Sequence, residues 1–84
     1  MYCDVNQIKV VGPLQLEVVF ADGIRGRVVF EPTHLTGVFT SLQNPEFFNQ
    51  VGINGGAVSW PGDIDLAPDA MHEAIRKSGE WVLR

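Results

Sequence analysis

The chain has 84 residues, of which 45% are hydrophobic and 19% charged, and it carries a net charge of −4 with a pI of about 4.9. This length and composition predict one globular domain over residues 1–84 and exclude a disordered tail, because a chain so rich in apolar residues can bury enough of them to fold. The acidic balance argues against direct nucleic-acid binding, which depends on clustered basic residues, and favours a basic protein partner.

The first part of the chain has the pattern of antiparallel strands. Apolar residues recur at every second position in residues 14–20 and 24–30, as in half-buried strands. Residues 7–12 are expected to form a strand before them. One face of this sheet should be apolar, and the other should carry a mixture of charged residues and valines.

The loop between residues 20 and 24 decides the register of this hairpin. A three-residue loop pairs Leu16 with Val28 and keeps apolar side chains opposite each other, whereas a two-residue loop would mix the two faces. The three-residue loop also places Gly23 in the left-handed conformation, which glycine adopts at the lowest cost. We therefore predict the longer loop.

Three short helices are expected in the rest of the chain. Asn44 and Pro45 are typical of the N-cap and first position of one helix, and Pro68 begins another that Gly79 ends. A helix before these is indicated by apolar residues at helical spacing, which are Leu35, Val38, Phe39 and Leu42.

A second hairpin is predicted between the last two helices. A two-residue turn at residues 54–55 places Val51 opposite Val58, and Trp60 falls on the same side as Val58, which makes it a core residue. Residues 80–84 are too apolar for a free end, although the sequence does not place them. The fold class predicted from these elements is α+β: antiparallel β-hairpins packed with two or three short helices.

The sequence shows no set of residues typical of an enzyme active site. Cys3 is the only cysteine, and it has neither a basic neighbour nor a helix N-terminus to activate it as a nucleophile with His34 or His72. His34 is interpreted as a surface or hydrogen-bonded structural residue. We expect no catalytic residue, no cofactor and no enzymatic activity.

Four ionisable residues lie close together in residues 63–72, and they could bind a divalent cation. They are Asp63, Asp65, Asp69 and His72. Their spacing matches neither an EF-hand loop nor a zinc motif. The favoured interpretation is that Asp65 and Asp69 cap the following helix and His72 lies on its solvent side. Metal or small-ligand binding by this segment remains the alternative function.

The cysteine count and the absence of long apolar segments predict the cellular compartment of the protein. One cysteine cannot form an internal disulfide, which favours a reducing compartment. No segment approaches the roughly 20 apolar residues of a membrane helix, and the first residues lack the pattern of a signal peptide. We expect a cytoplasmic protein with no membrane partner.

The outward face of the first sheet is the candidate interface. It carries Val19, Arg25, Arg27 and Val29. A fully solvated face would be more polar, so either residues 80–84 or another protein should cover it. The edge formed by the first strand would also be open to the addition of a strand.

The order of these signals resembles a family of small bacterial domains of unknown function, number twenty-four forty-two in that series. The resemblance covers most of the chain and rests on residues 16–23 (LEVVFADG), 37–42 (GVFTSL), 44–48 (NPEFF) and 58–69 (VSWPGDIDLAPD). It implies an α+β fold without defined catalytic residues. Members occur alone, ahead of a helix-turn-helix, or beside another small gene as in toxin–antitoxin pairs, and we expect the stand-alone form here.

We therefore expect a binding or regulatory module that acts through protein–protein contacts, with an antitoxin-like relation to a small basic partner as one form. A structural homodimer is a further alternative.

Overall fold

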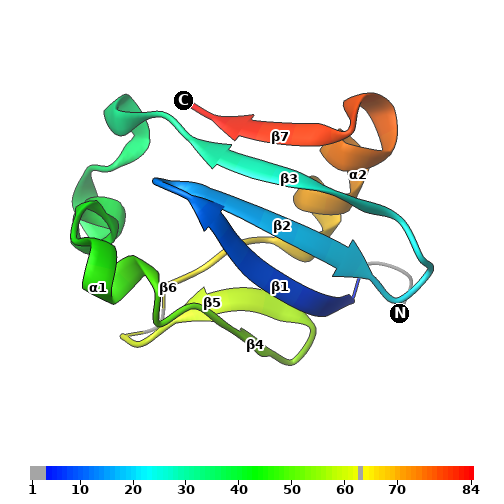
Figure 1. Ribbon diagram of the computed structural model, residues 1–84, viewed down its shortest axis with the longest axis horizontal. Helices are drawn as coiled ribbons and strands as arrows, with labels where there is room; N and C mark the ends of the chain where they lie inside the picture. The colour runs from blue at the N-terminus through cyan, green and yellow to red at the C-terminus, as the bar shows by residue number, and fades with distance from the viewer. Residues whose placement is uncertain (1–3, 63) are drawn as a thin grey trace.

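The computed structural model describes residues 4–62 and 64–84, and it shows two sheets packed around one core (Figure 1). Cys3 and Asp63, which the sequence singled out, lie outside the described residues, as does the side chain of Val38. The strands are β1 (Val5–Gly12), β2 (Gln15–Phe20), β3 (Arg25–Phe30), β4 (Gly52–Asn54), β5 (Ala57–Trp60), β6 (Ile64–Asp65) and β7 (Glu80–Leu83). The helices are the 3-10 helices η1 (Pro32–His34) and η2 (Gly37–Gln43) and the α-helices α1 (Pro45–Phe48) and α2 (Pro68–Ser78). The α+β class is confirmed.

The β2–β3 hairpin has the predicted three-residue loop. Leu16 lies opposite Val28, and the main-chain N–H of Phe20 donates to the oxygen of Ile24 at 2.7 Å. Gly23 has a φ of 90°, in the left-handed region, and the Asp22 side chain accepts a hydrogen bond of 3.0 Å from the Ile24 N–H. The local turn chemistry and the apolar register therefore agree.

Two irregularities bend β1 away from a straight course along β2. The register shifts between Val5 and Gln7 and again between Val10 and Gly12, so that one residue is unpaired at each place. Such bulges bend a strand and increase its twist. The bend carries the start of β1 to the second sheet, where the Val5 N–H donates to the oxygen of Gly56 at 2.8 Å.

The C-terminal residues form β7, which lies parallel to β3 at the edge of the first sheet. The four-stranded sheet has the order β1-β2-β3-β7, and Val82 lies opposite Val29. Leu83 is buried in the core. This answers the question the sequence left open: the tail widens the sheet instead of covering its outward face.

The segment before α1 was expected to be one helix over Leu35–Leu42, and that prediction is wrong. The chain forms two 3-10 helices with a break between them, because Thr36 is extended and Gly37 has a φ of 58°. Leu35 and Leu42 are nevertheless buried. Residues three apart share a side of a 3-10 helix as well as of an α-helix, so the apolar spacing did not distinguish the two.

The two α-helices begin where the sequence predicted, and α2 also ends there, whereas α1 ends at Phe48 and does not reach Val51. The Asn44 side chain accepts a hydrogen bond of 2.9 Å from the Glu46 N–H, which caps α1. Helix α2 starts at Pro68 and ends at Gly79, whose φ is 84°. Its N-cap is Ala67, and no side chain caps it. The predicted capping by the neighbouring acidic residues is therefore wrong, whereas Asp69 does lie in the first turn, where its charge suits the helix dipole as predicted.

The turn of the second hairpin lies one residue later than predicted. Ile53 pairs with Val58, and the turn consists of Gly55 and Gly56, whose φ angles are 59° and 84°. A type I′ turn needs a positive φ at both central positions, and two glycines supply it at lower cost than Asn54 and one glycine. Asn54 remains in the strand opposite Ala57.

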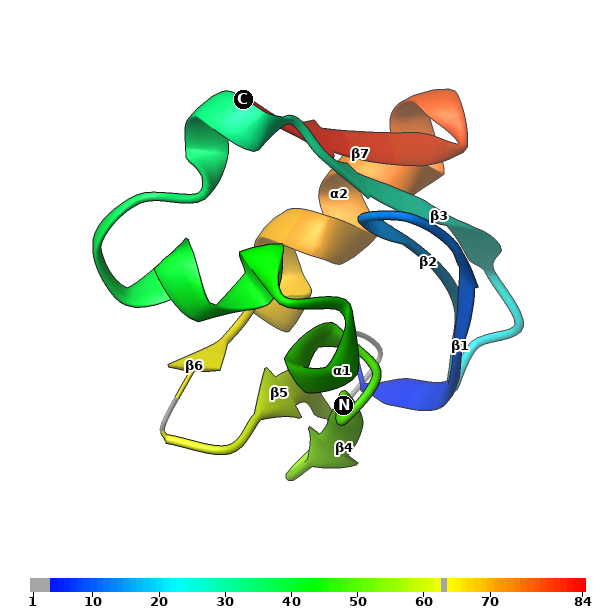
Figure 2. The same cartoon turned by 60° about the vertical axis from the view of Figure 1, so that its left-hand side comes forward.

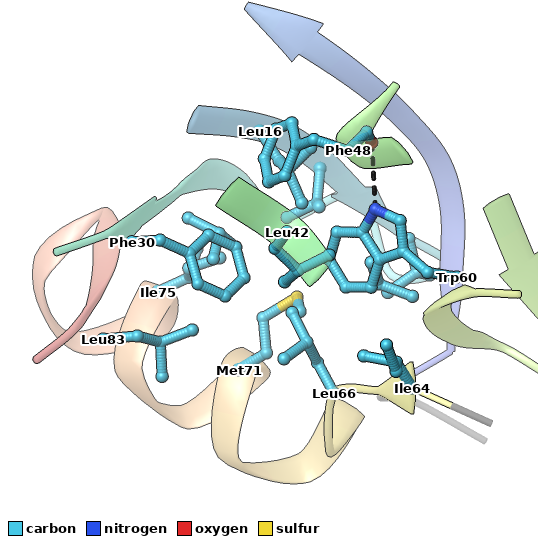
Figure 3. Close-up of a cluster of buried hydrophobic side chains, with 14 of the residues drawn as sticks. Leu16, Phe30, Leu42, Phe48, Trp60, Ile64, Leu66, Met71, Ile75 and Leu83 are labelled. Carbon is cyan, nitrogen blue, oxygen red and sulfur yellow. Dashed lines mark hydrogen bonds between the residues drawn. The ribbon is translucent and has the colours of Figure 1, made fainter. Parts of the chain in front are cut away.

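The core joins the two sheets and α2 through aromatic side chains (Figure 3). The rings of Phe30 and Trp60 lie 5.9 Å apart between centroids, and those of Phe48 and Trp60 lie 5.7 Å apart. The indole N–H of Trp60 donates to the Phe48 oxygen at 2.9 Å, so its polar group is satisfied inside the core. Trp60 is thus a core residue, as predicted.

Gly26 allows the end of α2 to lie directly against β3. A Cβ at Gly26 would be 2.6 Å from the main-chain oxygen of Gly79 and would also overlap the Ile75 side chain. That same oxygen accepts a hydrogen bond of 3.1 Å from the Arg27 N–H. Contact between main chains leaves no flexible group that could move aside.

We predict that Gly26→Ala lowers the free energy of unfolding by about 2–3 kcal/mol, since overpacking against main chain is relieved only by moving α2. Urea denaturation measures the loss. Gly52→Ala is the matched control, because Gly52 is also in a strand and a Cβ added there would meet no atom within 4 Å. Equal stability of the two variants would contradict close packing at Gly26.

Candidate functional site

The four residues predicted to form an interface lie together on one surface of the four-stranded sheet. Val19 of β2 lies opposite Arg25 of β3, and Arg27 and Val29 follow at alternate positions. The arginines are exposed and the two valines half-buried, whereas Val18 and Val28, which point the other way, are completely buried. The alternation comes from the period of a strand, in which successive side chains point to opposite faces.

We call this surface the outer face. Paired residues of neighbouring strands lie on the same side of a sheet, so the register extends the face across all four strands. Its members are Gln7, Lys9, Gln15, Glu17, Val19, Arg25, Arg27, Val29, Glu80 and Val82. Figures 1 and 2 show α2 and the second sheet on the other side, with no described helix lying over the outer face.

A row of four charged residues crosses the outer face, one from each strand. From β1 to β7 these residues, which we call the charged row, are Lys9, Glu17, Arg27 and Glu80. Their charges alternate in sign. Opposite charges on neighbouring strands stabilise a sheet modestly, and they also give its surface a defined electrostatic pattern.

Valines lie on both sides of the charged row. Val19 lies on one side of it, and Val29 and Val82 pair on the other. All three are half-buried. The face therefore combines apolar contact area with ordered charge.

The sequence did not identify Lys9, Glu80 or Val82 as parts of this face. Alternation in β1 could have pointed to Lys9, although the bulges obscure it. Nothing local indicates that Glu80 and Val82 lie beside β3, because parallel pairing depends on the path of α2.

Two hollows lie at the ends of the outer face. One, of about 230 Å³, is bordered by both arginines of β3 together with Glu17 and Glu80. The other, of about 540 Å³, lies beside Lys9 and Val19 and is bordered by Ile53 of β4. Ile53 is 39% exposed. The first hollow is thus bordered mainly by charged residues, and the second by polar, charged and apolar residues together.

His72 does not lie on the solvent side of its helix, as the sequence suggested. Its Nε2 lies 2.8 Å from Oδ2 of Asp22, in the β2–β3 loop, and its ring packs edge-on against Phe20 with centroids 4.9 Å apart. The hydrogen bond with His72, followed by the one from the Ile24 N–H, holds the pKa of the Asp22 carboxyl below its usual value. This pair ties α2 to the first hairpin.

The acidic segment before α2 shows no metal site in the part that the structure describes. Asp65 and Asp69 are exposed, and His72 is paired with Asp22 instead of with either of them. Across residues 4–62 and 64–84, no cluster of three or more histidine, cysteine or acidic side chains is placed to hold a metal ion.

His34 has a structural environment, in agreement with the interpretation of the sequence. Its Nδ1 lies 3.2 Å from the main-chain oxygen of Arg84, and its ring lies 5.0 Å from that of Phe39 between centroids. The histidine therefore connects the 3-10 segment to the end of β7. Cys3, which the sequence paired with it as a catalytic possibility, is outside the described residues.

Comparison with known proteins gives one match. The model of a family described as "Protein of unknown function (DUF2442)" matches residues 5–77. Neither a curated protein nor a solved structure matches the chain significantly. None of the helices in the described residues has the length and apolar character needed to cross a membrane.

We predict that Asp22→Asn lowers the urea midpoint at about pH 6 and that the difference from wild type shrinks as the pH falls below 3.8. The pKa of Asp22 is lowered in the folded state, so its contribution to stability is complete above the unfolded value of 3.8 and is lost as the pH falls through the lower folded value. Asparagine keeps an oxygen that can accept from the Ile24 N–H.

Asp65→Asn is the control for this experiment, because the Asp65 side chain is exposed, and its midpoint should follow that of wild type at each pH. A midpoint difference for Asp22→Asn that persists unchanged at the lower pH would show that the hydrogen-bonded Asp22 carboxylate is not its source.

Proposed function

The chain belongs to DUF2442, a family of proteins of unknown function, and from its outer face we propose that it is a protein-binding module without catalytic activity. The observation that carries this proposal is the charged row flanked by valines on a face that no described helix covers. Interfaces combine apolar contact with charged groups in a fixed arrangement. The outer face supplies both.

Arg27 is the expected anchor of the interface. It is exposed, lies in the middle of the charged row, and is two residues from Val29 on the same face. The planar guanidinium group can pair with a carboxylate while its aliphatic stem packs on valines, which is why arginine is frequent at the centre of interfaces.

A basic protein is the partner that the charge of the chain favours. The net charge of −4 would accelerate the encounter with a positively charged molecule, while the alternating row would fix the orientation of the bound partner. Specifically, we propose that the protein acts in the cytoplasm like an antitoxin, by binding and masking a small basic protein.

A homodimer is the second candidate, and the charged row favours it specifically. A two-fold axis through the middle of the row would place Lys9 against Glu80 of a second copy and Glu17 against Arg27. An alternating row of four charges is therefore complementary to itself. A two-fold interface needs this self-complementarity, because the same patch occurs on both subunits.

We predict that replacing Val19 and Val29 together by threonine weakens association through the outer face by roughly tenfold or more, because apolar contact area is lost from both sides of the row. Sedimentation over a wide concentration range measures self-association, and the mass of the complex purified from the native host measures association with a partner. Glu73→Gln, on α2, is the control. Unchanged masses in both assays, with the fold intact by circular dichroism, would exclude this face.

Charge reversal distinguishes the homodimer from a complex with another protein. Glu17→Arg or Arg27→Glu alone should reduce dimer formation, since each places like charges against each other across the two-fold axis. The double variant that exchanges the two residues restores opposite charges there and should restore the dimer. A complex with a different protein would be weakened by the exchange instead. Denaturation curves for each variant check that the sheet itself is intact.

A further inference from the structure

An apolar hollow of about 500 Å³ lies between the turn that joins β1 to β2 and the segment formed by η2 and α1. Its walls include Val10, Pro13, Leu14, Leu42, Pro45 and Phe48, and no charged residue is among the described residues that line it. Hollows of this size with mainly apolar walls are typical of binding sites. The sequence did not indicate it, because its walls come from segments that are far apart along the chain.

Leu14 keeps one wall of the hollow in place despite an unfavourable backbone conformation. Its φ is 56°, and among the described residues other than glycine no other φ is positive. Glycine or asparagine would adopt this conformation more easily. Leucine at this position places a large apolar side chain on the hollow, where it is half-buried.

Strand β1 forms one edge of the four-stranded sheet (Figure 1), and Val10 and Gly12 of this strand line the hollow. In antiparallel pairs the main-chain groups of successive residues point alternately to the two neighbouring strands. Phe20 directs its N–H and C=O groups towards the β3 side, because it donates to the Ile24 oxygen and accepts from the Gly23 N–H. Val18 and Leu16 lie two and four residues earlier in the same strand, so their main-chain groups also point towards β3.

Their partners on β1 consequently direct these groups away from β2. The partners are Ile8, which pairs with Val18, and Val10, which pairs with Leu16. In the described part of the chain, no main-chain hydrogen bond from another element reaches either residue. Two N–H and two C=O groups are therefore available at this edge.

The open part of the edge is short. At its start, Val5 already donates to Gly56 of the second hairpin, and at its end the bulge at Val11 interrupts the ladder. The accessible main chain spans residues 8–10. Val10 points to the inner side of the sheet, as its partner Leu16 does, and so towards the hollow.

We propose that residues 8–10 bind an extended peptide segment of another protein, with one large apolar side chain of the peptide seated in the hollow. An added strand is the occupant that satisfies free N–H and C=O groups, and alternate side chains of that strand point to the inner side of the sheet. A small apolar molecule would fill the hollow and leave the edge unpaired. The peptide site uses the main chain of residues 8–10 and the inner side of the sheet, whereas the outer face uses the Lys9 side chain, so this proposal does not depend on the function proposed for that face.

The probe is a set of acetylated nonapeptides in which threonine alternates with valine, lysine stands at both ends, and the central residue is leucine, phenylalanine or alanine. Lysine suits the net charge of −4 on the protein. With the leucine and phenylalanine peptides, we expect saturable shifts of the Ile8 and Val10 amide signals in NMR spectra and slower hydrogen exchange at both. The alanine peptide should bind about tenfold more weakly, since less apolar surface is buried.

Two controls separate the edge from the hollow. N-methylation of three consecutive main-chain nitrogens, those of the central residue and of its two neighbours, should abolish binding, because these include the donors to β1 for either direction of the added strand. Leu14→Asn on the protein should weaken binding of the leucine peptide at least tenfold while relieving the unfavourable φ. Glu73→Gln, exposed on α2 and away from both the hollow and the edge, should leave binding unchanged.

Several outcomes would overturn the proposal, and the peptide series decides even if Leu14→Asn does not fold. Absence of shifts at millimolar peptide would exclude the site. Equal affinity for the leucine and alanine peptides would exclude the hollow, and binding that survives N-methylation would exclude strand addition. Shifts of Ile8 and Val10 that depend on protein concentration without peptide would identify a second copy of this chain as the occupant.

Discussion

The close contact between β3 and the end of α2 is the constraint on which the rest of the structure depends. Because Gly26 has no side chain, the helix can finish directly against the strand, and Gly79 can hydrogen-bond to Arg27. From that point the chain continues as β7 in register with β3. The same contact directs Met71 and Ile75 into the core and sets which face of the sheet remains uncovered.

The outer face is a consequence of this arrangement. Without β7 the sheet would lack Glu80 and Val82, and the charged row would end at Arg27. With β7 the row has two positive and two negative charges in alternation. It is therefore complementary to a partner surface with the opposite order of charges, and also to the same row of a second copy. Surface ion pairs within one sheet contribute little to stability, so the value of this pattern lies in recognition and orientation.

The bend of β1 contributes to the other proposed binding surface, the apolar hollow beside this strand. Bulges bend β1 so that its start joins the second hairpin at Gly56, while its later residues diverge from that sheet and border the apolar hollow. The core beneath is closed by Phe48 and Trp60, with the indole N–H satisfied by a main-chain oxygen. An edge with free main-chain groups beside an apolar hollow is therefore built by the same bend that closes the core.

The sequence by itself determined the elements whose signals are local. Alternating hydropathy defined the β2–β3 register and hence the side of the sheet on which Val19, Arg25, Arg27 and Val29 lie. Terminal residues such as Asn44, Pro68 and Gly79 marked the ends of the α-helices. Both kinds of pattern depend on neighbours along the chain. Apolar spacing could not show whether the segment before α1 forms a 3-10 helix or an α-helix. It also could not show that the turn of the second hairpin lies at Gly55 and Gly56, because both choices depend on backbone energies. Only the tertiary structure decided the parallel pairing of β7, the His72–Asp22 contact and the hollow beside β1, because each joins residues distant in sequence through the path of α2 or the bend of β1.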